Sequence, residues 1–90
     1  MTMPLTELSK PALSRRARLQ YDEVRQLDLL LLPERAVKLN RSAAAILALC
    51  DGQRTVGEIA RELETRFEQP GLLNEILEFL HQASDQRWVV

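Results

Sequence analysis

The side chains best suited to catalysis are scarce in this chain, which has one histidine, His81, and one cysteine, Cys50. A nucleophilic cysteine needs a base within hydrogen-bonding reach, and a zinc site needs three or four ligands. His81 falls in a polar stretch of a predicted helix and is expected at the surface. Cys50 falls at an apolar helical position and is expected in the core. The sequence therefore predicts neither an enzyme nor a metal or cofactor site.

The glycines and serines add no further chemistry. Gly52, Gly57 and Gly71 lie far apart in the chain, so they form no loop that could cradle a phosphate. The serines lie outside any nucleophile-elbow pattern. A domain without such groups is expected to act by binding a partner.

The first residues are expected to differ from the rest. Residues 1–17 contain Pro4 and Pro11 without an apolar period, which predicts a flexible arm before a domain at 18–90. The chain lacks both a secretory signal and an apolar run near the ~18 residues that span a membrane. With no intrachain disulfide possible, the cytoplasm is the expected location.

A small sheet is predicted over residues 18–40. Residues 18–21 and 36–39 alternate polar and apolar side chains, as half-buried strands do. Between them, the apolar run at 27–32 is short and ends at Pro33, which favours a strand over a helix. Together these segments predict an antiparallel sheet of two or three strands, which must pack on something to be stable.

Three helices are predicted after the sheet. Asn40 or Ser42 can cap the first, whose apolar face would include Ala44. Thr55 and Glu58 form a capping box for the second. The third is expected at about 72–85 and is followed by a short apolar tail. This order predicts an α+β fold that is winged-helix-like.

The third helix is apolar over an unusually wide arc. Its apolar side chains span about 160° at roughly 100° per residue, whereas a core-facing stripe needs about 100°. One edge, either Phe79 with Leu72 or Leu77 with Leu73, would then be partly exposed and free to bind a partner. Alternatively, the whole arc is core and is closed by the tail around Trp88.

Charge weighs against nucleic acid as the partner. The chain has 12 basic and 13 acidic residues and a net charge of −1. The third helix carries Glu75 and Glu78 and has no basic residue before Arg87, so it would repel phosphate. A winged-helix DNA-binding regulator is kept as the alternative function, because the predicted architecture fits one.

Several segments in a specific order resemble the PqqD family, small proteins of pyrroloquinoline quinone (PQQ) biosynthesis. The segments are Leu-Leu-Leu-Pro-Glu at 30–34, Val-Lys-Leu-Asn at 37–40, the run at 44–52, Thr-Val-Gly-Glu-Ile at 55–59, and the closing Gly71, Leu72, Glu78, Phe79, Leu80, Arg87 and Trp88. The match covers about residues 15–90.

The resemblance implies a non-catalytic peptide chaperone without a cofactor. Family members bind the leader of a ribosomally made precursor peptide and present it to a radical S-adenosylmethionine enzyme. A leader could add as a strand to an exposed sheet edge. We expect that edge at residues 36–39, beside the third helix. The predicted peptide-binding residues are Arg35, Ala36, Val37, Lys38, Leu39, Leu72, Glu75, Ile76, Phe79 and Ala83.

Two further expectations concern the same edge. Proline at Val37 is expected to weaken peptide binding by removing a backbone donor while the helices stay folded. The edge could also pair with a second copy of the chain, so a homodimer is a further expectation. No contact with a membrane is expected.

Overall fold

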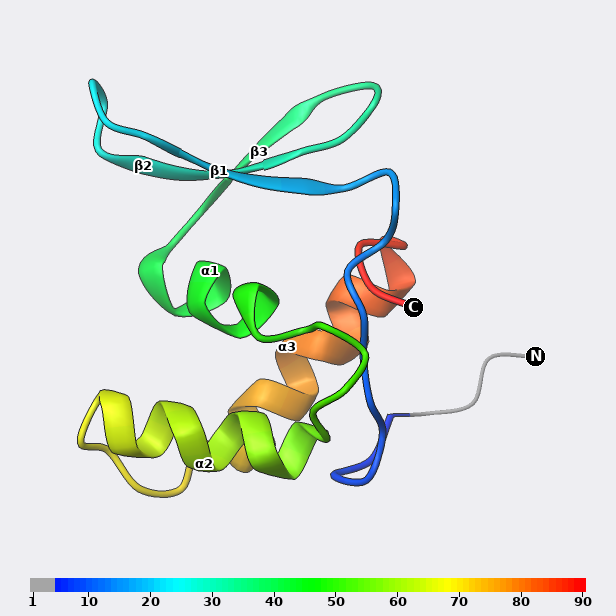
Figure 1. Ribbon diagram of the computed structural model, residues 1–90, viewed down its shortest axis with the longest axis vertical. Coiled ribbons are helices and arrows are strands. Elements are labelled where there is room, and N and C mark those ends of the chain that lie inside the picture. The colour runs from blue at the N-terminus through cyan, green and yellow to red at the C-terminus, as the bar shows by residue number, and fades with distance from the viewer. Residues whose placement is uncertain (1–4) are drawn as a thin grey trace.

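Three antiparallel strands precede three helices in the computed structural model, which describes residues 5–90 (Figure 1). The strands are β1 (Arg18–Asp22), β2 (Leu27–Leu31) and β3 (Ala36–Leu39); the helices are α1 (Arg41–Ala48), α2 (Val56–Arg66) and α3 (Leu73–Asp85). Helix α1 lies between the sheet and α2, and α2 packs on α3 (Figure 1). The predicted α+β order, a small sheet and then three helices, is confirmed.

The sheet is a meander with β2 in the centre. Leu30 of β2 lies opposite Leu19 on one side and Val37 on the other, and it is completely buried. Successive side chains of a strand point to opposite faces, so this row faces α1 and leaves the remaining leucines of β2 on the outer face. Order β1-β2-β3 makes both β1 and β3 edge strands.

Side-chain caps define the starts of the first two helices. Asn40 Oδ1 accepts a hydrogen bond from the Ala43 amide at 2.7 Å, so Asn40 rather than Ser42 caps α1. The buried face of α1 includes Ala43, Ile46 and Leu47. Ala44 was expected on that face but is only half buried, because it lies about 100° around the helix from Ala43 and on the side opposite Ile46.

The start of α2 leaves no unsatisfied amide. The predicted capping box is present: the Glu58 amide donates to Thr55 Oγ1 at 3.1 Å, and the Thr55 amide donates to Glu58 Oε1 at 2.8 Å. The other two free amides, of Val56 and Gly57, donate to the carbonyls of Ser9 and Glu7, each at 2.9 Å. Those two acceptors come from the segment before β1.

That segment is packed against the body of the protein. Pro11 is fully buried, and the Gly52 amide donates to its carbonyl at 3.0 Å. Ala12 exchanges two hydrogen bonds with Val90, at 3.1 and 2.8 Å, and the Leu13 amide donates to Cys50. The division into an arm at 1–17 and a domain at 18–90 stays a prediction; residues 9–14 nevertheless form part of the packed structure, and residues 1–4 lie outside the described part.

Helix α3 ends in a turn that folds the chain back on itself. The Arg87 amide donates to the Ser84 carbonyl at 3.0 Å and the Trp88 amide to the Ala83 carbonyl at 2.9 Å. Arg87 has φ 64°, so these bonds form a Schellman motif with arginine at the left-handed position that usually holds glycine. Beyond the turn, Val89 is buried and forms a bridge with Leu13, so the tail does close part of the core.

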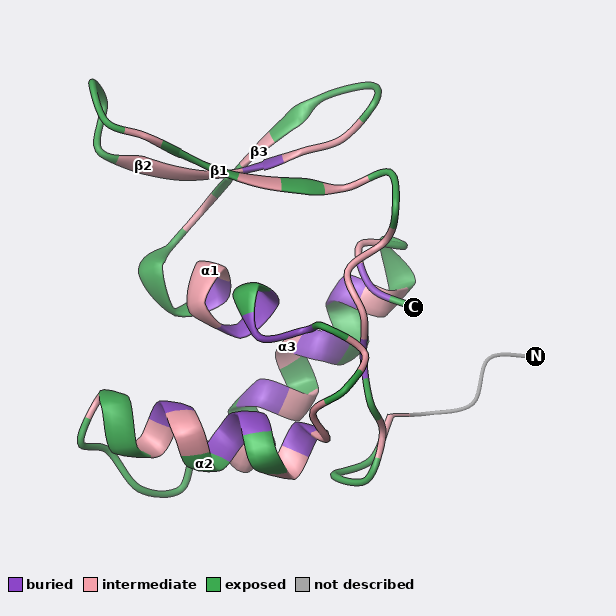
Figure 2. Cartoon of the chain, in the orientation of Figure 1, coloured by how far each residue is buried: buried purple, intermediate pink, exposed green. Residues whose placement is uncertain are grey.

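The core lies where the three helices and β2 meet, and Figure 2 shows buried residues concentrated on the facing sides of the helices. Cys50 is part of it, as predicted: its thiol donates to the Ile46 carbonyl at 3.3 Å. Burial, and then the charge of Asp51, raises the pKa of that thiol to about 12. His81 is exposed, as predicted, and its Nε2 lies 3.2 Å from the Leu5 carbonyl oxygen.

Candidate functional site

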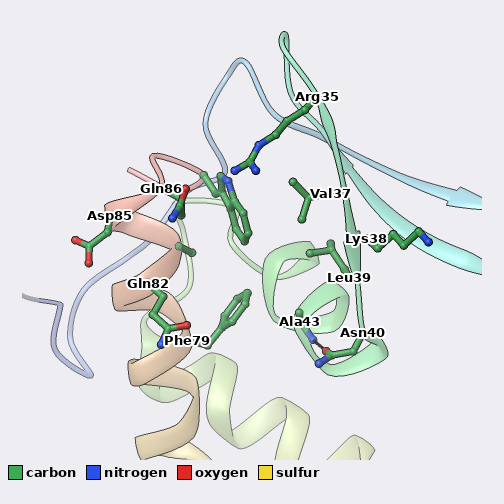
Figure 3. A pocket seen from close by; sticks show the side chains of 12 residues that line it. Arg35, Val37, Lys38, Leu39, Asn40, Ala43, Phe79, Gln82, Asp85 and Gln86 are labelled. Carbon is green, nitrogen blue, oxygen red and sulfur yellow. Dashed lines mark hydrogen bonds between the residues drawn. The ribbon is translucent and has the colours of Figure 1, made fainter.

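Two cavities that share residues adjoin α3, one between β3 and α3 and the other among the three helices. The upper one, about 500 Å³, is bounded by β3 on one side and the C-terminal half of α3 on the other (Figure 3). The lower one, about 270 Å³, is bounded by α1, α2 and the N-terminal half of α3. Asn40, Ala43 and Phe79 line both. We refer to the two cavities together as the β3–α3 groove.

The upper cavity contains most of the predicted peptide-binding residues. Val37 and Leu39 point into it from β3, and Phe79 points into it from α3 (Figure 3). All three are half buried, as expected of apolar side chains that line a groove open to solvent. The predicted residues that line this cavity are Arg35, Val37, Lys38, Leu39, Phe79 and Ala83.

The lower cavity contains the others, except one. Leu72, Glu75 and Ile76 line it together with Phe79. Leu72 and Ile76 are buried, so they are core residues that also form its floor, whereas Glu75 is exposed at its rim. Ala36 lines neither cavity and is exposed on the outer face of β3.

The burial of its side chains shows which parts of the apolar arc of α3 are core and which are exposed. Phe79, at one edge of the arc, is half buried and lines both cavities, while its predicted companion Leu72 is buried. Leu73 and Leu77, at the other edge, are also half buried, and both pack against the core. The arc is therefore core along its centre and partly exposed along both edges.

Charged side chains are few and lie at the ends of the groove. Lys38 lines the upper cavity but its side chain points away on the outer side of β3, and Asp85 points away from α3 (Figure 3). Arg35 reaches from the start of β3 toward α3 (Figure 3). Val37, Leu39 and Phe79 thus form an apolar strip along the groove, uncharged polar side chains border it, and a guanidinium lies at its upper end.

Hydrogen bonds in the preceding turn determine which backbone groups of β3 are free. Leu32 and Arg35 exchange both of their backbone hydrogen bonds, at 2.8 and 3.4 Å. In an antiparallel ladder, hydrogen-bonded and non-hydrogen-bonded pairs alternate. Within the sheet, the backbone of Val37 therefore bonds to Leu30, and the backbone of Leu39 bonds to Asp28. The amides and carbonyls of Ala36 and Lys38 point outward, along the free edge.

This alternation corrects the expectation for proline at Val37. The Val37 amide bonds within the sheet, so proline there would break the β2–β3 ladder rather than remove a donor from the free edge. The donors that an added strand would use belong to Ala36 and Lys38. Ala36 thus contributes to the site through its backbone although its side chain lies outside the groove.

Some residues that line the two cavities were not predicted from the sequence. Gln82, Gln86 and Trp88 complete the upper cavity, and Asn40 and Ala43 form the boundary between the two cavities. Helical spacing could have indicated Gln82 and Gln86, because they follow Phe79 along one side of α3. Trp88 could not be placed from the sequence, since its position depends on the left-handed turn at Arg87.

The groove is suited to binding an extended, mainly apolar chain beside a free strand edge. Among residues 5–90, no group of three or more His, Cys, Asp or Glu side chains is placed to hold a metal ion. In the same part of the chain, no helix is both long enough and apolar enough to cross a membrane. What the arrangement offers is backbone pairing along β3 and apolar contact across to α3.

The chain is similar to known proteins over most of its length. Residues 29–89 match the family model described as coenzyme PQQ synthesis protein D (PqqD). A relative called PqqA binding protein in Pseudomonas paraeruginosa is 43% identical to this chain, and the match covers 99% of this chain and 97% of that one. A second protein of that name, in Bradyrhizobium diazoefficiens, is 33% identical, and the match covers 91% of this chain and 82% of that one.

A solved structure has the same fold. It is the solution NMR structure of the PqqD truncation of Methylobacterium extorquens PqqCD, described as a functional and stand-alone recognition element for ribosomally synthesised and post-translationally modified peptides. Its TM-score to this chain is 0.81 at 35% sequence identity, and the match covers 96% of this chain and 94% of that one.

Proposed function

The chain belongs to the PqqD family, and we propose that it is a non-catalytic protein that binds a PQQ precursor peptide in the β3–α3 groove. The observation that carries this proposal is the free edge of β3 running beside a groove that is lined by Val37, Leu39 and Phe79. A peptide that adds as a further strand obtains backbone hydrogen bonds from that edge, and its apolar side chains enter the groove.

The backbone contacts are assigned by the register. A peptide strand along β3 exchanges hydrogen bonds with Ala36 and Lys38, whose amides and carbonyls point outward. Every second side chain of that peptide then faces Val37, Leu39 and Phe79 across the groove. This division lets backbone bonds provide affinity while the apolar contacts select the sequence.

The groove holds the peptide without transforming it. Bound in this way, a leader leaves the remainder of the precursor free for a separate modifying enzyme, which the family resemblance indicates is a radical S-adenosylmethionine enzyme. The alternative of a DNA-binding regulator gains no support, because the exposed side of α3 carries Glu75 and Glu78.

The proposal is tested by changing the Lys38 backbone while the sheet is left intact. Lys38→Pro removes an outward amide from an edge strand, where proline is tolerated. We expect affinity for the precursor peptide to fall about five- to ten-fold, the equivalent of one hydrogen bond of ordinary net strength. Isothermal titration calorimetry with the synthetic precursor measures the change.

Two control variants separate the backbone from other effects. Lys38→Ala removes the outward-pointing side chain but keeps the amide, so its affinity should stay near that of the unchanged protein. Val37→Pro breaks the β2–β3 ladder and should lower the free energy of unfolding by about 2 kcal/mol or more. If Lys38→Pro is folded and binds the peptide as tightly as Lys38→Ala does, strand addition at β3 is wrong.

The expected homodimer concerns the same surface. Self-association through β3 would cover the Ala36 and Lys38 backbone groups, so dimer formation and peptide binding would exclude each other. Peptide affinity measured at two protein concentrations would then be lower at the higher one. Equal affinities would place any self-association elsewhere.

A further inference from the structure

One buried polar group in the groove has no hydrogen-bond partner. Among the buried side-chain nitrogen and oxygen atoms of residues 5–90, Trp88 Nε1 is the one left without an acceptor. A buried indole N–H usually finds a partner, and an unsatisfied one destabilises the protein. The sequence contains one tryptophan, so this donor is unique in the chain.

Trp88 belongs to the wall of the groove rather than to the centre of the core. It lines the upper cavity with Arg35 and Val37, and the residue as a whole is half buried although Nε1 is enclosed. The indole therefore has one side in the core and another at the cavity. Because Nε1 itself has almost no exposed surface, an acceptor from a molecule in this cavity reaches it only when a neighbouring side chain moves, and the exposed Arg35 side chain at the same cavity can do so.

The backbone fixes the indole at this place from two directions. The Trp88 amide donates to the Ala83 carbonyl at 2.9 Å, and the Trp88 carbonyl accepts from the Ser14 amide at 2.8 Å. Arg87, with φ 64°, turns the chain between α3 and this position. These bonds fix the backbone of Trp88, and its indole is packed against the core before any ligand arrives.

The neighbouring groups indicate which acceptor fits. Arg35, exposed and on a long flexible side chain, reaches toward α3 at the same end of the cavity (Figure 3). The only carboxylate lining the cavity, Asp85, points away from it (Figure 3). An indole N–H and a guanidinium are both donors without an acceptor of their own, so the end of the groove is suited to a carboxylate.

We propose that Trp88 Nε1 and Arg35 together bind an acidic side chain of the precursor peptide, and that this contact fixes the register of the peptide along β3. The inference rests on the proposed function and adds a specificity site to it. Apolar contacts and backbone bonds would tolerate a shift of the peptide by two residues, whereas a single carboxylate held at one end does not.

The first test follows the single indole directly. In ¹⁵N-labelled protein, the Nε1–H of Trp88 gives one resonance that needs no assignment. We expect it to shift on addition of the precursor peptide and its exchange with solvent to slow. If the Ala36 and Lys38 amides shift while the indole resonance does not, this inference is wrong and the proposed function stands. If none of the three shifts, the proposed function itself fails.

A second test removes the donor without changing the shape of the side chain. Benzothienylalanine, incorporated at position 88, replaces the indole N–H by sulfur. We expect peptide affinity to fall about ten-fold, while the free protein is at least as stable as before because an unsatisfied donor is gone. A bond from Nε1 to a buried water would give the reverse: lower stability of the free protein and unchanged affinity.

The carboxylate is identified by a double-mutant cycle. Each acidic residue of the peptide is replaced in turn by its amide, and every peptide is titrated into the natural protein, Arg35→Gln and the benzothienylalanine protein. One replacement should weaken binding to the natural protein several-fold and have a clearly smaller effect on the other two. If every acidic residue behaves additively, the acceptor is not a carboxylate and the assignment is overturned.

Discussion

At the scale of single residues, two carboxylates support the connection between α1 and α2. Asp51 Oδ1 accepts from the amides of Gln53 and Arg54, at 2.9 and 3.1 Å, and Glu58 completes the capping box with Thr55. These hydrogen bonds lower the pKa of the Asp51 and Glu58 carboxyls, chiefly through the backbone amides that they accept. Both residues are exposed, so their effect is on the pH dependence of folding rather than on the core.

The direction of the pH dependence follows from the lowered pKa. A carboxyl whose pKa is lower in the folded protein than in the unfolded chain stabilises the fold above its unfolded value, and that contribution is lost as the pH falls through its folded value. The ordinary values are 3.8 for Asp51 and 4.5 for Glu58. We therefore expect stability to decrease below about pH 4.5.

Glu58→Gln isolates one of the two contributions. The amide keeps an acceptor oxygen for the Thr55 amide but removes the charge, so the loss of stability on acidification should be shallower than in the natural protein. Urea denaturation between pH 3 and pH 7, followed by circular dichroism, measures the slope. A slope identical to that of the natural protein would show that Glu58 does not titrate with folding.

At the scale of elements, the strained turn after α3 positions part of the groove. Left-handed backbone at a non-glycine residue costs about 1 kcal/mol. Arg87 has this conformation, at the position where a Schellman motif favours glycine. Arg87→Gly should therefore raise the free energy of unfolding by about 0.5–1 kcal/mol, as measured in urea. A decrease would mean that the Arg87 side chain makes a contribution larger than the strain.

The elements show what a sequence can predict and where it fails. All three strands and all three helices were predicted, the strands and α3 with their bounds within one residue, because apolar patterns and turn or cap residues mark these segments in the sequence. The direction of the β3 amides was predicted wrongly at Val37. Sequence alternation fixes which side chains share a face, but hydrogen bonding is set by the turn at Leu32 and Arg35.

At the scale of the whole molecule, the least predictable feature was the role of the first segment. The residues at 9–14 have no period, and their partners, Cys50, Gly52, Trp88 and Val90, lie far away in the chain. Local propensity contains no information about such pairs. The groove could be predicted only in part for the same reason. Its β3 and α3 walls follow from the apolar periodicity of the sequence, whereas the position of Trp88 depends on pairing between distant segments.

A shortened chain tests whether this segment holds the fold together. Starting the chain at Arg15 removes the carbonyls that cap α2, the buried Pro11 and the pairing of Ala12 with Val90. We expect a loss comparable to the total stability of a small domain, roughly 5 kcal/mol or more. The midpoint of thermal unfolding, compared with that of a chain starting at Leu5, measures it.

The comparison also decides the role of the segment. Starting at Leu5 keeps every described residue, so that variant controls for the effect of shortening. If the chain starting at Arg15 unfolds at the same temperature, residues 9–14 are an arm in solution, as the sequence alone suggests.

The pairing of Ala12 with Val90 also has a kinetic consequence. Contacts between opposite ends of a chain require the largest loop to close, so they tend to form late in folding and to open first in the native state. The helices and the β-meander can assemble from neighbouring segments, but the Trp88 side of the groove must wait for this last closure. Hydrogen exchange at Val90 would then report how often the native protein opens one wall of its own groove.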